Sequence, residues 1–475
     1  MPPTTFDNPF TFGVNLDLSF WGWFAVLPGG EQVRIIFALI GWAGVALVLF
    51  YMGAWLWMEY RQETKYTNHW QWVLLAVDIP PLYIQTPKAV EQIFAHLSGA
   101  GIHPNIGDKF WHGKRQKWFS LEIISLEGYT QFLIRTEIEF RDLVEAAIYA
   151  QYAEAEITEV EDYALEIPRR YPNPDYDVMG VEFKLAADDV YPIRTYEEFE
   201  YSISKDLVFS DPMAALLENF SRIGHGENMW LQIIVEPTDS HWKEEGIQLV
   251  KKMMGHKGRG EETVTSKLTD LPRAALQELS NIWYWQFEPG EHVEGPSGLD
   301  INKLSPGTKA TIEAIENKIS KIGFKTKIRV LYAARKDIYN PSRCLDGLVG
   351  AFNQFHMQNR NAIVPHAKTH AHYDYQHRKS NTLKRRFVQR YQKRKIKAGA
   401  TPYIMNIEEL ATIWHFPLPF VKTPLLQKAG AKRGEPPMEL PVESSEPRLR
   451  AVVSQAKPTP VPTPAVPTEE ELPYG

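Results

Sequence analysis

The sequence predicts an α+β protein with one N-terminal transmembrane helix, two ferredoxin-like (split βαβ) units after it, and a disordered, proline-rich C-terminal tail. Three observations lead to this prediction. The run 35–58 is apolar and carries no charged residue. Segments of strand period and helix period then recur twice in the same order. After about residue 430 the chain is dominated by proline, glutamate, alanine and threonine.

The run from Ile35 to Met58 is long enough to cross a membrane as a single helix. At about 1.5 Å per residue it exceeds the roughly 30 Å of the hydrocarbon layer. Aromatic residues, which membrane interfaces favour, stand at both ends; they are Phe20, Trp21, Trp23, Phe24, Trp55, Trp57 and Tyr60. We therefore expect residues 33–60 to form a transmembrane helix.

The flanking charges predict the orientation of this helix. No Lys or Arg precedes Arg34, whereas Arg61 and Lys65 follow the apolar run. Cytoplasmic flanks carry the excess of positive charge, so residues 1–32 are expected outside the cell and the bulk in the cytoplasm. The prediction is a single-pass protein of the cytoplasmic membrane.

The charge distribution and the cysteine content indicate which partners and which cellular compartment fit the protein. The formal net charge is −6, but the segment from Arg378 to Lys397 contains ten Lys or Arg and no acidic residue. Without it the chain has 42 basic and 58 acidic residues, so an acidic body carries one basic segment. The single cysteine, Cys344, excludes a disulfide framework within the chain and fits a reducing compartment. It falls on a predicted helix, which indicates a structural thiol rather than a nucleophile.

The first predicted unit covers residues 70–165. Thr86 followed by Pro87 is typical of a helix start, and Glu127-Gly128 is typical of a tight turn between two strands. The predicted elements are strand 72–77, helix 87–97, strands 119–123 and 132–134, helix 140–148 and strand 155–160. In this order two helices would cover one face of a four-stranded antiparallel sheet.

The second predicted unit covers residues 178–375 and follows a proline-rich connector, 168–174. Its predicted elements are strand 181–185, helix 211–223, strand 230–235, helix 305–322, strand 326–332, helix 340–352 and strand 363–375. Without residues 240–323 the order again matches the split βαβ pattern. We expect those residues to be a helical insertion, with further helices at 242–254 and 274–285.

The C-terminal part divides into three predicted segments. Residues 379–398 form a basic helix with Leu383, Phe387, Tyr391 and Lys395 on one side, and 405–417 form a short helix that ends at a proline. Together they make a region 378–420. Residues 430–475, with five prolines between Pro458 and Pro467, are expected to be disordered.

Common catalytic motifs are missing from the sequence. It has no phosphate-binding loop, no His-Glu-x-x-His zinc helix and no Gly-x-Ser-x-Gly elbow. His370 and His372 would share a strand face and offer two zinc ligands, but no third ligand is evident, so a solvated strand is favoured. The sequence therefore predicts a protein that is not an enzyme and that has no metal site, no cofactor and no catalytic residues.

The basic segment 378–397 is the candidate binding site. Three interpretations remain open: contact with nucleic acid, in which Phe387 or Tyr391 would stack on bases; docking onto an acidic protein or anionic lipid; and a merely solvated helix. The candidate contact residues are Lys384, Arg385, Arg386, Arg390, Lys393, Arg394, Lys395 and Lys397.

Several stretches resemble a known family. They are Trp118-Phe-Ser-Leu-Glu-Ile-Ile-Ser-Leu-Glu-Gly128, the run from Phe140 to Tyr152, the run from Glu159 to Tyr163, and the run from Asn406 to Pro417. Across residues 70–420 the chain resembles the membrane-anchored region that precedes the motor in conjugation-type, type IV secretion ATPases of candidate-phyla bacteria. Where the nucleotide-binding domain of that family would begin, this chain has its proline-rich tail. The resemblance therefore implies no catalytic residues and a motor ATPase on a separate subunit.

From these observations we expect a non-catalytic, membrane-tethered structural component of a type IV secretion or conjugation-like translocation apparatus, which positions a separate motor ATPase. The expected partners are that ATPase, further copies of the chain, and DNA or anionic lipid at the basic segment. The alternative is a membrane-bound nucleic-acid-binding protein that acts through residues 378–397 without a motor.

Overall fold

The computed structural model describes residues 19–80, 85–102, 104–203, 206–209, 211–254, 305–369 and 377–418. The chain divides into two compact units. The first unit comprises Met1–His69 and Pro104–Arg115, and the second comprises Trp70–His103 and Gln116–Gly475. The predicted helix 274–285, the predicted disordered tail 430–475, and His370 and His372 lie outside the described residues.

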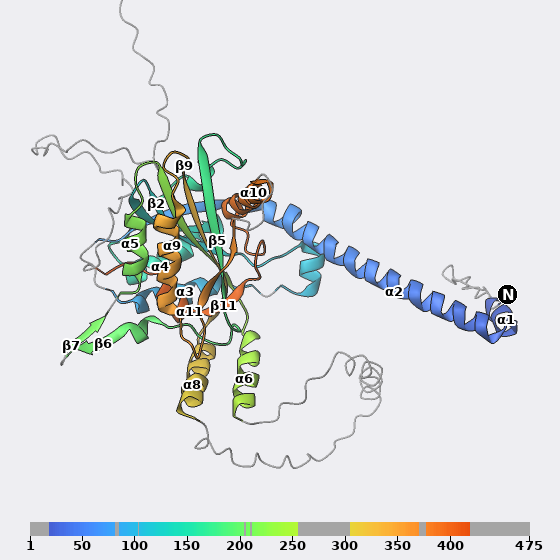
Figure 1. Ribbon diagram of the computed structural model, residues 1–475. Coiled ribbons are helices and arrows are strands. Elements are labelled where there is room, and N and C mark those ends of the chain that lie inside the picture. The colour runs from blue at the N-terminus through green and yellow to red at the C-terminus, as the bar shows by residue number, and fades with distance from the viewer. Residues whose placement is uncertain are drawn as a thin grey trace, which may run out of the picture. The chain divides into compact units, whose positions relative to one another are not determined.

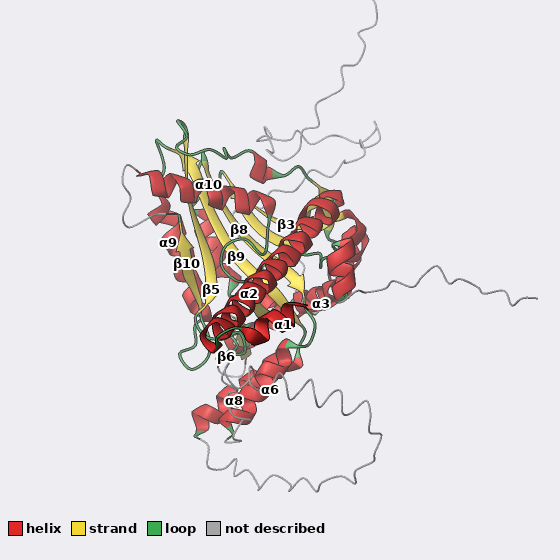
Figure 2. Ribbon diagram, turned by 90° about the vertical axis from the view of Figure 1, so that its right-hand side faces the viewer, coloured by secondary structure: helices red, strands yellow, loops and turns green. Residues whose placement is uncertain are grey.

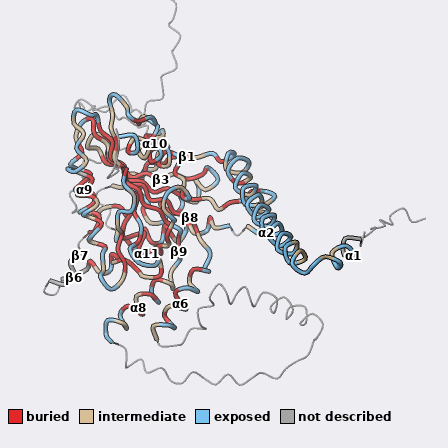
Figure 3. Tube along the Cα trace, turned by 45° about the vertical axis from the view of Figure 1, so that its right-hand side comes forward, coloured by how far each residue is buried: buried red, intermediate tan, exposed pale blue. Residues whose placement is uncertain are grey.

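The first unit is dominated by one long apolar helix. The short helix α1 (Ser19–Val26) precedes α2 (Gly29–Tyr60), and the helical path continues through Arg61–Tyr66 to His69. Within Gly29–His69 the mean hydropathy reaches 2.4 and the apolar stretch is not buried by the rest of the chain (Figure 3). Among the residues described, one helix is thus long and apolar enough to span a membrane, and it lies where the sequence predicted it.

The second unit is built on one antiparallel sheet of nine strands (Figure 1). The order is β10-β5-β9-β8-β2-β3-β1-β4, and β11 pairs with β9 beside β5. The strands are β1 (Trp72–Asp78), β2 (Phe119–Leu126), β3 (Tyr129–Glu137), β4 (Glu156–Glu159), β5 (Tyr176–Leu185), β8 (Glu227–Pro237), β9 (Gly323–Arg335), β10 (Ile363–Lys368) and β11 (Tyr403–Asn406). A separate hairpin joins β6 (Glu200–Ile203) to β7 (Asp206–Phe209).

The strand order repeats in the two halves of the sheet. β4-β1-β3-β2 in the first half corresponds to β10-β5-β9-β8 in the second. The sequence predicted a four-stranded sheet for the first unit, but β2 pairs along its whole length with β8, so the sheet continues into the second half. Ile123 lies opposite Leu231, and Leu121 lies opposite Ile233, so apolar side chains of both halves meet on one face. A single continuous sheet results.

Five helices cover one face of this sheet and enclose the main core (Figure 1). Their apolar faces follow the helix period that the sequence shows, and proline stands at the first turn of α3 and α9. They are α3 (Pro87–Leu97), α4 (Arg141–Gln151), α5 (Met213–Ser221), α9 (Pro341–Ala351) and α11 (Ile407–Ile413). Between β8 and β9 the chain forms α6 (Trp242–Met253) and α8 (Pro306–Ser320), which pack on each other in the region predicted as an insertion.

The opposite face of the sheet is also covered, which the sequence did not predict. Helix α10 (Arg378–Lys393) lies across it, as Figure 2 shows, and the connector after β4 packs beside it. Trp230, Leu331 and Ala333 of the sheet face Phe387 and Tyr391 in this second core. The basic segment is therefore an integral layer of the fold.

The residues after α10 are equally part of the body. We expected one helix over 405–417, but residues 403–406 form strand β11, and α11 begins only at Ile407. Asn406 starts the helix because its side chain accepts a hydrogen bond from the Glu409 backbone N–H while Glu409 bonds back to the Asn406 N–H. Trp414 follows the last residue of α11 with an extended backbone and is fully buried.

Gly180 of β5 allows α10 to approach the sheet. A Cβ atom at this position would overlap the ring of Phe387. We predict that Gly180→Ala forces this ring away and lowers the free energy of unfolding by about 1–3 kcal/mol, as overpacking of a core does. The measurement is the urea midpoint of the full chain in detergent, followed by tryptophan fluorescence.

Gly350 in α9 is the matched control, because a Cβ atom there would meet no other atom within 4 Å. Gly350→Ala should leave the midpoint unchanged or raise it slightly, since alanine favours helix by up to about 1 kcal/mol. Equal midpoints for the two variants would show that Phe387 does not pack on Gly180.

Candidate interaction surface on the basic helix

Helix α10 has one apolar face and one basic face. Phe387, Val388 and Tyr391 are buried against the sheet, whereas Arg385 and Arg386 are exposed. The helix ends at Lys393, earlier than predicted, because Arg394 adopts a left-handed backbone conformation with φ 48° and ψ 39°. This turn directs the Arg394 side chain into the protein.

The apolar face is held by stacked rings. The Tyr391 ring lies 5.7 Å from that of Trp230, and Trp230 meets Tyr163 edge-on at 4.6 Å. Tyr163 comes from the connector after β4 and Trp230 from β8, so the helix, the connector and the sheet share one packed cluster. Offset and edge-on pairs of this kind add about 0.5–1.5 kcal/mol each to the burial of the rings.

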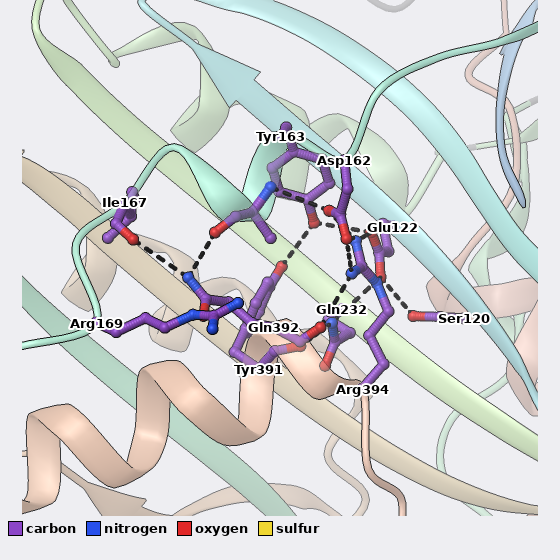
Figure 4. Close-up of polar contacts among 11 residues, drawn as sticks. Ser120, Glu122, Asp162, Tyr163, Ile167, Arg169, Gln232, Tyr391, Gln392 and Arg394 are labelled. Carbon is purple, nitrogen blue, oxygen red and sulfur yellow. Dashed lines mark hydrogen bonds and ion pairs between the residues drawn. The ribbon is translucent and has the colours of Figure 1, made fainter. Parts of the chain in front are cut away.

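Gln392 fastens α10 to the connector. Its Nε2 donates to the carbonyl oxygen of Ala164 at 2.7 Å and to that of Ile167 at 3.2 Å (Figure 4). Its Oε1 accepts a bond of 2.6 Å from Nε of Arg169. Donors and acceptor of this amide are thus all used, which a buried amide requires.

Arg394 forms the centre of a buried ion cluster. Its Nε and Nη2 donate to the two carboxylate oxygens of Glu122 at 2.7 and 2.9 Å. Its Nη1 and Nη2 donate to Asp162 at 2.7 and 2.9 Å. Figure 4 shows the guanidinium between the two carboxylates. Such two-pronged pairs are among the strongest hydrogen bonds in proteins.

Glu122 of β2 receives further donors. Ser120 Oγ donates at 2.6 Å, Tyr163 Oη at 2.8 Å and Gln232 Nε2 at 3.2 Å. Glu122 is opposite Gln232 in the β2–β8 pair, so this carboxylate lies where the two halves of the sheet join. Arg394 therefore connects α10 to that junction.

A second set of sheet residues caps the C-terminal end of α10. Gln232 Nε2 donates to the Tyr391 carbonyl at 3.2 Å, and Arg329 Nη1 donates to the Arg390 carbonyl at 3.4 Å. Arg329 also pairs with Glu182, which lies opposite it on β5. Cations and N–H donors are favourable here, because the last carbonyls of a helix have no partner within the helix.

The pKa values follow from this burial and pairing. Burial alone lowers the pKa of Arg394, but the charges of Glu122 and Asp162 raise it by more, so it lies well above the usual guanidinium value. Burial raises the pKa of Asp162, yet the Arg394 charge outweighs this and the pKa lies below its usual value. Both groups are therefore charged at neutral pH.

The eight predicted contact residues occupy different environments. Arg385, Arg386, Lys393 and Lys397 are exposed, and Arg390 and Lys395 are half-buried. Lys384 is half-buried and pairs with Asp177 at 2.6 Å. We call Arg385, Arg386 and Lys393 the basic ridge.

Two expectations about the segment need correction. Arg394 is fully buried, so it cannot touch an outside partner; its role is to hold the helix. Phe387 and Tyr391 are buried as well, so neither ring can stack on a base. Both corrections have one cause, which is that the helix packs on the sheet instead of extending into solvent.

The described residues contain no cluster of three or more potential metal-binding side chains. A pocket that they border has a volume of about 270 Å³ and is lined in part by Arg360, Glu198 and Lys318. In it Arg360 pairs with Glu198, and Lys318 pairs with Glu409 at 3.0 Å. Arg360, Glu198 and Lys318 therefore take part in ion pairs within the protein.

Sequence reasoning missed the anchors of the helix, namely Glu122, Asp162, Gln232 and Arg329. The strand period places Ser120 and Glu122 on the face opposite Phe119 and Leu121, but it does not reveal that this face is covered. A signal existed in the alternation of apolar and basic positions along 379–398, since an amphipathic helix indicates a surface to cover.

Removing the Arg394 charge should destabilise the fold. In Arg394→Met the buried carboxylate of Glu122 and the half-buried carboxylate of Asp162 lose their cation, and breaking a buried pair in this way costs about 3–5 kcal/mol. We expect a corresponding fall in the urea midpoint of the full chain in detergent.

Arg386→Met is the control for this experiment, because it removes the same charge from the exposed face of the same helix. Its effect should stay within about 0.5 kcal/mol. If both variants unfolded at the same urea concentration, the Arg394 cluster would not stabilise the protein.

The burial of Lys327 predicts how the free energy of unfolding depends on pH. Burial and the charge of Arg329 lower the pKa of Lys327 from 10.5 to about 8. Between these values the unfolded chain binds more protons than the folded chain, so the free energy of unfolding should rise with pH, by at most about 1.4 kcal/mol per pH unit. In urea titrations between pH 8 and pH 10.5, the free energy of unfolding of Lys327→Met should not show this rise. If it rose with pH as steeply in Lys327→Met as in the wild type, the prediction would be contradicted.

One comparison with known proteins identifies a family and gives no activity. No curated protein matches the sequence. The family described as "Domain of unknown function (DUF8128)" matches residues 116–428, about two thirds of the chain. The match includes Glu122, Asp162 and Arg394, and the chain belongs to the DUF8128 family.

Proposed function

We propose that this protein is a non-catalytic scaffold, tethered to the cytoplasmic membrane by α2, that positions a separate motor ATPase in a translocation apparatus similar to type IV secretion or conjugation. In this proposal residues 1–32 lie outside the cell and the sheet body lies in the cytoplasm. The basic ridge binds an acidic surface of the motor subunit. Further copies of the chain assemble beside it.

The observation that carries the proposal is a fixed row of cations on an acidic body. Arg385, Arg386 and Lys393 are exposed on a helix whose other side is bound to the connector through Gln392 and to the sheet through Arg394. A cationic surface attracts an acidic partner and suppresses contact with other basic surfaces. The ridge belongs to a segment of ten Lys or Arg without an acidic residue, whereas the rest of the chain has 42 basic and 58 acidic residues.

A structural role also accounts for the buried ionisable groups. Arg394 binds Glu122, Lys318 binds Glu409, and His415 binds Asp211 at 2.9 Å. Each pair joins a residue of the segment 394–415 to another element of the body. These pairs fasten the segment to the body, which explains the burial of the ionisable groups without a catalytic role.

The architecture of the sheet body is compatible with a scaffold on which other subunits assemble. We interpret each half of the sheet as a split βαβ unit, since both halves have the strand order of that motif with a helix after the first and the third strand. The two split βαβ halves then form one sheet, because β2 of the first half pairs with β8 of the second. A rigid body of this kind keeps the ridge at a constant distance from the rest of the body.

The geometry favours a protein partner over nucleic acid. With Phe387 and Tyr391 buried, the helix lacks the aromatic platform on which single strands stack. Contact with nucleic acid would then rest on phosphates alone and would weaken steeply with salt.

The test is co-purification from detergent-solubilised membranes. The variant Arg385→Glu with Arg386→Glu reverses two adjacent charges of the ridge. We expect the intact chain to retain a nucleoside-triphosphatase that the variant loses by at least tenfold, about 1.4 kcal/mol.

The control variant is Lys251→Glu with Lys252→Glu, which reverses two adjacent exposed charges on α6. It should retain the partner like the wild type. Equal loss from both variants would argue for a net-charge effect. Recovery of nucleic acid alone would favour the nucleic-acid-binding alternative, and ATP hydrolysis by the purified chain would refute the non-catalytic role.

A further inference from the structure

The segment 104–115 leaves the sheet body between α3 and β2 and joins the unit of the long apolar helix. Nε of Arg61, just after α2, donates to the Trp111 carbonyl at 3.1 Å. The backbone of Gly113, with φ 68°, lies directly on Arg61: a Cβ atom there would be 2.7 Å from the Arg61 carbonyl oxygen. The segment is therefore fixed to the C-terminal end of the helix, and Figure 1 shows it in light blue beside α2.

This segment exposes large apolar side chains. Ile106 is 84% exposed and Trp111 is 63% exposed. The Trp111 ring meets Phe110 edge-on at 5.1 Å, so the turn presents an aromatic pair. Exposing such groups to water is unfavourable by roughly 25 cal/mol per Å² of apolar surface.

The exposed groups continue an existing apolar surface. Trp55, Trp57 and Tyr60 are exposed at the end of α2, and Trp111 is bonded to Arg61, one residue later. Tryptophan and tyrosine concentrate where a membrane meets water, because their rings are apolar and their edges polar. A span that ends at Tyr60 would thus bring this segment to the same depth.

The polar residues of the segment fit an anionic leaflet. Lys109 and His112 are exposed, and Arg61 lies beside them. Asp108 is paired with Lys114 at 3.2 Å, so its charge is offset within the turn. Apolar side chains flanked by cations are the composition that binds at a lipid headgroup layer.

We propose that residues 104–112 form a second membrane contact, which inserts Ile106 and Trp111 into the headgroup layer of the bilayer that α2 crosses. The inference rests on the proposed membrane span. Because both ends of the segment continue into the sheet body, three chain connections rather than one join that body to the membrane-bound unit.

The test measures the depth of single probes in the full chain. Cys344→Ser provides a background without cysteine, into which Ile106→Cys is placed and labelled with bimane. Val48→Cys in α2 serves as the lipid control, and Glu139→Cys, which replaces an exposed side chain of the body, serves as the aqueous control. The protein is reconstituted in vesicles of phosphatidylcholine and phosphatidylglycerol, with brominated phosphatidylcholine or iodide as quencher.

We expect brominated lipid to quench the probe at position 106 several-fold more than the probe at 139, and iodide to quench it several-fold less. If position 106 behaves like 139 while position 48 is protected from iodide, the second contact is wrong and the span stands. If position 48 is also open to iodide, the span and the membrane-tethered function both fail. Protection of position 106 from both quenchers would mean that protein covers it, which also overturns the proposal.

Discussion

The buried carboxylate of Glu122 is the constraint on which the arrangement of the body depends. It lies on β2, at the junction of the two halves of the sheet, and is fully buried. Transfer of such a charge from water costs several kcal/mol unless a cation and hydrogen bonds compensate it. Arg394 supplies the cation, and Ser120, Tyr163 and Gln232 supply donors. Closing the sheet face therefore requires α10 to dock with its C-terminal turn at this point.

The continuous sheet also solves a problem of exposed strand edges. A split βαβ sheet standing alone leaves its second strand at an edge, open to unwanted pairing. Here β2 and β8 cover each other, which removes two edges at once. The remaining outer strands are poor templates, since β4 has only four residues and β10 carries Pro365 beside a register shift.

Periodicity and helix-start signals were enough to predict most helices and strands of the sheet body in their order, but not the β6–β7 hairpin or β11. Thr86-Pro87, Ser305-Pro306 and Asn340-Pro341 each mark the beginning of an observed helix. The order β1-α3-β2-β3-α4-β4 of the first half likewise follows from alternating and helical spacing. These signals are local, because each depends on neighbouring residues along the chain.

The contacts between distant segments could not be predicted in this way. An edge strand and a paired strand have the same alternation, so Leu121 and Ile123 do not reveal that Leu231 and Ile233 lie opposite them. Strand β11 has four residues, which are too few for a clear period. It pairs with the start of β9, at residues 323–326, whereas β5 pairs with the later residues 329–335 of β9. A run of cations likewise gives no sign that one of them, Arg394, pairs with residues more than two hundred positions earlier.

The division of roles within the basic segment bears on how it can bind. A flexible basic tail must lose backbone freedom on binding, at about 1–2 kcal/mol for each residue that becomes ordered. The ridge of Arg385, Arg386 and Lys393 is already ordered, because Gln392 and Arg394 hold the helix from its buried side. Its remaining cost is the ordering of the exposed side chains themselves. A fixed ridge also presents its charges at constant spacing, so it should distinguish a partner with carboxylates at matching positions from a general polyanion. This is the physical reason to favour a defined protein surface as its partner.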